Sequence, residues 1–129
     1  MTLNRIDSND VYVQILDHTC EKVGGEIQVN SYVIGSQSQI RCSSFDNQTK
    51  FACSFVDHVN SNIQIIMKLF EPNGEIIGSE TTLLTGTGGG GAPFSSIHGA
   101  GNFGFVVAYN DGPAGQSNIL FSHYDITGK

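Results

Sequence analysis

The segment Val11-Tyr12-Val13-Gln14-Ile15-Leu16-Asp17 decides the fold, because the chain returns to the same pattern twice. Its counterparts, at a constant spacing of 54 residues, are Ile65-Ile66-Met67-Lys68-Leu69-Phe70-Glu71 and Ile119-Leu120-Phe121-Ser122-His123-Tyr124-Asp125. The same offset joins identical residues elsewhere, namely Glu21/Glu75, Gly24/Gly78, Glu26/Glu80, Gly35/Gly89, Phe51/Phe105 and Asp57/Asp111. A unit copied in this way usually stacks on its neighbours or binds through several copies at once.

Each copy divides into four short segments of β character separated by turn residues, and no segment has a helical period. The expected strands are 11–17, 26–30, 39–45 and 50–57 in the first copy, 65–71, 80–84, 94–98 and 103–110 in the second, and 119–125 in a third. We therefore expect an N-terminal leader (residues 1–10), a first β repeat (11–64), a second β repeat (65–118) and the first strand of a third repeat (119–129).

The third and fourth segments of each copy are predicted to form a hairpin with a two-residue loop, Asn47-Gln48 in the first copy and Gly101-Asn102 in the second. In the first hairpin this register places apolar side chains on both faces: Ile40, Cys42, Phe51, Cys53 and Phe55 on one, and Phe45, Ala52 and Val56 on the other. Each sheet should therefore be covered on both sides.

The expected fold class is all-β, with two four-stranded antiparallel repeat units that resemble propeller blades and one extra strand. Four plus four plus one strands cannot close a propeller, whose blades usually number about four to eight. Neighbouring chains are therefore expected to complete the incomplete unit.

The composition excludes several classes of partner. Six Lys and Arg against twelve Asp and Glu give a net charge of −6, and no basic cluster is available to neutralise a phosphate backbone. Nucleic acid is therefore not expected as a partner. Membrane insertion is not expected either, because no apolar run approaches about 18 residues. The first ten residues lack the apolar segment of a signal peptide, so an exported form would be a mature or excised piece.

No constellation of residues points to catalysis, to a metal or to a cofactor. The four His residues are scattered, Gly-x-Ser-x-Gly is absent, and the three Cys residues lack the spacing of a zinc site. The glycine-rich segment 85–91 leads into a predicted strand, whereas a phosphate-binding loop leads into a helix. The turns at 17–20 and 71–74 offer too few oxygen ligands for calcium. We therefore expect a protein that is not an enzyme.

Cys42 and Cys53 lie directly opposite each other in the predicted hairpin, at a separation that allows a disulfide bond. The alternative is a pair of small buried apolar residues, which free cysteines resemble. Asn47-Gln48-Thr49 is an N-glycosylation sequon at the predicted hairpin tip, and its use would imply an oxidising secretory compartment. Cys20 stands in a predicted exposed turn, at the position that Gly74 and Gly128 hold in the other copies, and is either a free thiol or a partner for another chain.

The repeats resemble a known family in three segments, which are Val11–Asp17, Val23-Gly24-Gly25-Glu26-Ile27-Gln28-Val29-Asn30 and Asn102-Phe103-Gly104-Phe105-Val106-Val107-Ala108-Tyr109. They are similar to the roughly 50-residue tandem repeats of very large secreted adhesins and RTX-like surface proteins, also found in long extracellular proteins of ciliated protozoa. The resemblance spans essentially residues 11–129 and implies a repeated extracellular module with no assigned catalytic residues.

The leading functional hypothesis is a non-catalytic structural or adhesive module, extracellular or on the cell surface, that associates with copies of itself or with adjacent repeats. Its expected assembly strand is 119–125, with Ile119, Phe121 and Tyr124 as the contact residues. The alternative is a carbohydrate-binding, lectin-like oligomeric propeller, in which Tyr12, Tyr32 and Tyr109 would stack on sugar rings of a glycan. An enzyme is the third class, without a catalytic constellation to support it.

Overall fold

The computed structural model describes residues 9–31, 35–59, 62–87, 94–111 and 118–129. Within them the chain forms nine β-strands, one single-turn 3₁₀ helix (Gly101–Phe103) and no α-helix. The strands are β1 (Tyr12–Leu16), β2 (Lys22–Gln28), β3 (Ser36–Phe45), β4 (Lys50–Val59), β5 (Asn62–Phe70), β6 (Ile76–Thr87), β7 (Ser95–Gly99), β8 (Phe105–Asp111) and β9 (Asn118–Tyr124). Each corresponds to one of the nine segments expected from the sequence.

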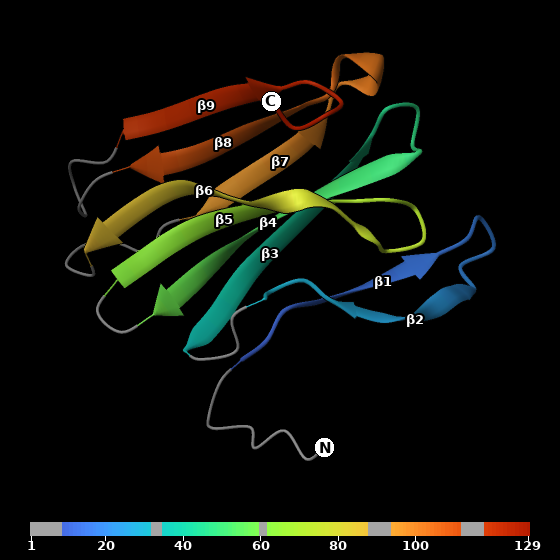
Figure 1. The fold of residues 1–129 in the computed structure, drawn as a ribbon, viewed down its shortest axis with the longest axis horizontal. Helices are drawn as coiled ribbons and strands as arrows, with labels where there is room; N and C mark the ends of the chain where they lie inside the picture. Colours follow the sequence, from blue (N-terminus) through green and yellow to red (C-terminus); the bar gives the residue numbers. More distant parts are fainter. Residues whose placement is uncertain (1–8, 32–34, 60–61, 88–93, 112–117) are drawn as a thin grey trace.

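The nine strands form three antiparallel sheets (Figure 1), ordered β1-β2, β3-β4-β5-β6 and β7-β8-β9. The prediction of an all-β fold with antiparallel sheets, one of them four-stranded, is confirmed. The grouping differs from the expected units, because the four-stranded sheet joins the last two strands of the first copy to the first two strands of the second. β4 pairs with β5 along its length, from Phe51 opposite Phe70 to Val59 opposite Asn62. The expected boundary between residues 64 and 65 therefore falls inside β5.

The four-stranded sheet lies between the other two sheets and is covered on both faces, as its two apolar faces predicted (Figure 1). On the side of the three-stranded sheet lies a cluster that we call the β7-side core: Phe45, Ala52, Met67, Leu69, Ile97, Phe105 and Val107. On the side of the two-stranded sheet lies the β1-side core: Val11, Val29, Cys53, Phe55, Ile66 and Phe70. Burial of these side chains is the main force that holds the three layers together.

The β3-β4 hairpin has the predicted turn. The Thr49 N–H donates to the Asp46 carbonyl oxygen over 3.0 Å, and both central residues, Asn47 and Gln48, have positive φ angles of 53° and 65°. Asp46 also has a positive φ angle, 49°, and four residues (46–49) lie between the last paired strand residues, Phe45 and Lys50. Positive φ angles at the two central turn residues match the right-handed twist of the strands. Cys42 lies opposite Cys53 as expected, but an irregularity between Ser38 and Arg41 interrupts the register beyond that pair.

The predicted two-residue loop in the second hairpin is wrong. Gly99 pairs with Phe105, so the loop is one residue longer than in the first hairpin and contains the 3₁₀ turn. The additional residue is Gly104, with a φ of +102°, where a Cβ atom would lie 1.9 Å from the carbonyl oxygen of Tyr124. Only glycine tolerates this conformation and this close approach, and the first copy has Lys50 at the equivalent position.

One turn recurs at the 54-residue spacing in all three copies. It spans residues 17–21, 71–75 and 125–129, and in each case the first N–H donates to the fifth carbonyl and the fourth N–H donates to the first. The fourth residue has a positive φ angle each time: 66° at Cys20, 91° at Gly74 and 82° at Gly128. The sequence period is therefore visible in the backbone geometry of the described residues.

Candidate functional site

The described residues leave the outer two sheets incomplete at their edges. β5 pairs with β4 on one side and β6 on the other, whereas its counterpart β9 pairs only with β8 and its counterpart β1 pairs only with β2. An unpaired strand edge carries a row of backbone N–H and C=O groups that can bind another strand. These two edges are the candidate site for assembly.

The three residues predicted to make assembly contacts on β9 fall into two groups. Ile119 and Phe121 are exposed. Tyr124 instead packs against the β7-side core, and its ring stacks on Phe105 with centroids 5.3 Å apart. Burial raises the pKa of the Tyr124 phenol, partly offset by a hydrogen bond with Ser122. The Tyr124 side chain therefore packs β9 against the β7-side core, which lies between the three-stranded and four-stranded sheets.

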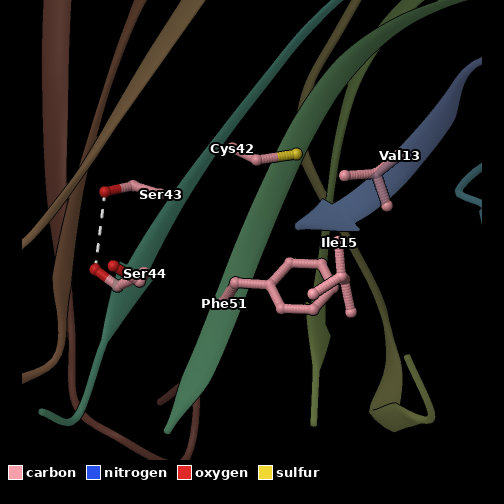
Figure 2. Close-up of a pocket in the computed structure, with 6 residues that line it drawn as sticks. All are labelled: Val13, Ile15, Cys42, Ser43, Ser44 and Phe51. Carbon is pink, nitrogen blue, oxygen red and sulfur yellow. Dashed lines mark hydrogen bonds between the residues drawn. The ribbon is translucent and has the colours of Figure 1, made fainter. Parts of the chain in front are cut away.

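The described surface also has a shallow pocket of about 160 Å³ between β1 and the β3-β4 hairpin (Figure 2). Val13 and Ile15 line it from β1, and the other lining residues are Cys42, Ser43, Ser44 and Phe51. The Phe51 ring is fixed by stacking on Phe70, with centroids 4.9 Å apart. The Ser43 hydroxyl accepts a hydrogen bond from the Gly99 N–H. The lining is mainly apolar and contains no acid, base or activated nucleophile. It can accept an apolar side chain and has no group for a chemical step.

Cys42 and Cys53 form a disulfide bond across the β3-β4 hairpin, with Cα atoms 4.1 Å apart. This resolves the alternative that the sequence left open. Cys53 is fully buried in the β1-side core, while Cys42 is at the surface. Cys20 is an exposed free thiol in the recurring turn. The sequon residue Asn47 is exposed at the hairpin tip.

The tyrosines considered for sugar stacking are not brought together in the described structure. Tyr12 is exposed on β1, whereas Tyr109 is partly buried against the β7-side core on the other side of the four-stranded sheet. Tyr32 lies outside the described residues.

Sequence reasoning missed a buried polar network beneath β1. The Asn30 amide accepts a hydrogen bond from the Val11 N–H over 3.0 Å and donates to Asp10 and Gln37. The Gln37 amide donates in turn to the Asp57 carboxylate over 2.7 Å. Because the buried groups are bonded to one another, the network fixes how the chain enters the first sheet and has the character of a structural support.

A buried lysine is the second feature that sequence reasoning missed. Lys68 lies within the apolar β5 segment and is almost wholly buried. Its ammonium group donates to the carbonyl of Val29 and the hydroxyl of Ser31, and forms an ion pair with Glu80 over 3.2 Å. A charged residue inside an apolar strand was the available signal. The contacts tie β5 to the chain segment that follows β2.

Among the described residues, no group of three or more His, Cys, Asp or Glu is placed to hold a metal ion. No helix in that part of the chain has the length and apolar character to cross a membrane. Comparison of the chain with protein-family models, curated proteins and solved structures finds no match. The resemblance to adhesin repeats stays a prediction.

Proposed function

We propose that the protein is a non-catalytic structural or adhesive repeat module of the extracellular space or cell surface, which self-associates through unpaired edge strands. The observation that carries the proposal is the unequal strand number of the three stacked sheets, two, four and three. The proposal takes the central sheet as a complete unit, and within the described residues each outer sheet has fewer strands than the central one.

The missing strands can be identified from the 54-residue spacing. Within the described residues, β9 has no neighbour on the side where β5 has β6, and the turn at residues 125–129 has the same hydrogen bonds as the turn that joins β5 to β6. In the part of the chain that the structure describes, β1 has no neighbour on the side where β5 has β4. The two free edges are therefore of different kinds. Contacts between unlike surfaces close into a ring or continue as an array or fibre.

The layered antiparallel sheets support the finer reading that they are blades of a propeller-like assembly. The Cys42–Cys53 disulfide and the exposed sequon at Asn47 support an extracellular location, because disulfides persist in oxidising compartments. A carbohydrate-binding role has less support, since Tyr109 packs against the β7-side core.

The mass of the purified protein in solution tests the proposal. Sedimentation velocity and light scattering from about 1 to about 100 μM should give multiples of the 13.8 kDa chain, because association follows mass action. Electron microscopy then separates rings from filaments. A monomer across that range would rule out self-association.

A further inference from the structure

Equivalent residues of β5 and β9 differ sharply in exposure. Ile65 and Met67 of β5 are 0% exposed, while Ile119 and Phe121, 54 residues later on β9, are 74% and 77% exposed. On β5 this face is covered by the three-stranded sheet, since Met67 belongs to the β7-side core. On β9 the corresponding face is exposed to solvent, and β9 belongs to the sheet at one end of the stack (Figure 1). Phe121 lies opposite Ala108 of β8 in the strand register.

The opposite end of the stack shows the same difference on the other face. Ile66 and Phe70 of β5 are 5% and 0% exposed in the β1-side core, because the two-stranded sheet covers them. Their counterparts on β1, Tyr12 and Leu16, are 41% and 52% exposed. Each end of the molecule therefore carries apolar residues at positions that another sheet buries in the central layer.

The 54-residue spacing indicates that the two end faces are complementary to each other. Inside the chain, Val11, directly before β1, packs in the same cluster as Ile66 and Phe70 of the four-stranded sheet. Ile119 is the counterpart of Val11, and Tyr12 and Leu16 are the counterparts of Ile66 and Phe70. The outer face of β1-β2 in a second copy therefore resembles the face of β5 that carries Ile66 and Phe70, and it could cover the outer face of β9 in the same way. Exposed apolar residues gathered on a sheet face mark a contact surface.

We propose that the outer face of β7-β8-β9 stacks on the outer face of β1-β2 of a second copy of this chain, with Ile119 and Phe121 against Tyr12 and Leu16. The inference rests on the proposed self-association, but it assigns the contact to sheet faces in addition to strand edges. Because the two faces differ, the contact is head-to-tail and propagates along the stack.

Two complementary blocked variants test this arrangement in the full chain. Phe121→Lys blocks the outer face of β7-β8-β9, and Leu16→Lys blocks the outer face of β1-β2. Because each lysine reduces the net negative charge of the chain, a loss of association cannot come from added repulsion between chains. Phe103→Lys is the matched control, because Phe103 is 79% exposed but lies in the 3₁₀ turn and not on the sheet face. Circular dichroism and mass mapping of the disulfide confirm that each variant is folded.

Sedimentation should show each blocked variant alone associating at least about tenfold more weakly than the unmodified chain, as expected for loss of a central apolar contact. An equimolar mixture should form a dimer of one copy of each and stop there, since each variant retains the face that the other has lost. The Phe103→Lys control should assemble like the unmodified chain.

Other outcomes overturn the inference in distinguishable ways. If both blocked variants assemble like the unmodified chain, the face contact is wrong while edge pairing survives. If one blocked variant alone forms a dimer, the contact joins two like faces and is not head-to-tail. If the Phe103→Lys control is equally impaired, the effect is not specific to the end faces. If the unmodified chain is a monomer, the proposed function fails first.

Discussion

Loss of the Cys42–Cys53 cross-link should destabilise the protein by an amount that the structure allows us to estimate. Cys42→Ser isolates the cross-link, because Cys42 is at the surface and the remaining Cys53 stays as a small buried apolar group. The bond closes a loop with a sequence separation of 11 residues. The chain-entropy relation then gives a stabilisation of about 3 kcal/mol from restriction of the unfolded chain. For a chain of this size, that corresponds to a fall in Tm of roughly 10 °C.

Urea denaturation followed by circular dichroism, without reductant, is the appropriate assay. Cys20→Ser is the matched control: Cys20 is an exposed free thiol, so its replacement should change the free energy of unfolding by less than about 0.5 kcal/mol. Reduction of the unmodified chain should reproduce the loss seen in Cys42→Ser. If Cys42→Ser keeps the urea midpoint and slope of the oxidised chain, the estimate and the assigned role of the cross-link are both wrong.

Two further predictions concern the contact between sheets and the recurring turn. Gly99→Ala should lower the free energy of unfolding by about 1–3 kcal/mol, because its Cβ would lie 1.8 Å from the Ser44 carbonyl oxygen. Gly25→Ala is the control: its Cβ would meet nothing within 4 Å, so the urea midpoint should stay nearly unchanged. Equal midpoints for the two variants would contradict the close packing at Gly99. Hydrogen bonds from the Thr127 hydroxyl, and then from backbone N–H groups, hold the pKa of Asp125 below its ordinary value of 3.8. The stabilisation from these hydrogen bonds is therefore complete above the pKa of the unfolded chain, and it is lost as the pH falls through the lower pKa of the folded protein. The Thr127 amide signal in NMR spectra should therefore move in acid, and should not do so in Asp125→Ala.

Local features were predictable from the sequence because local chemistry decides them. Alternating apolar residues located all nine strands, and a two-residue loop at Asn47-Gln48 was enough to place Cys42 opposite Cys53. The longer second loop was not predictable by analogy with the first copy. It depends on the contact between Gly104 and the Tyr124 carbonyl, which are 20 residues apart in sequence and meet only when β8 and β9 pair.

The buried polar groups were less accessible to sequence reasoning for a related reason. Asn30, Gln37 and Asp57 are residue types that are common in turns and at strand ends. Their hydrogen bonds form only when the segment after β2 meets the β3-β4 hairpin, in which Gln37 lies opposite Asp57. The Asp57/Asp111 identity signalled a shared position without revealing its partners. Lys68 shows the same limit, since burial of an ammonium group is acceptable only with the carbonyl, hydroxyl and carboxylate that tertiary structure brings to it.

The offset between the sequence repeat and the sheets bears directly on assembly. Because the first copy supplies β3 and β4 and the second supplies β5 and β6, the central sheet belongs to both copies and cannot form from either one alone. Successive copies are therefore joined by backbone hydrogen bonds within a sheet as well as by apolar contacts between sheets. Nearest-neighbour coupling of this kind makes the stability of an array depend on the interfaces between units. Among the described residues, the same offset leaves β1-β2 and β7-β8-β9 as partial sheets, and the proposed self-association uses their edges and apolar faces to add another copy.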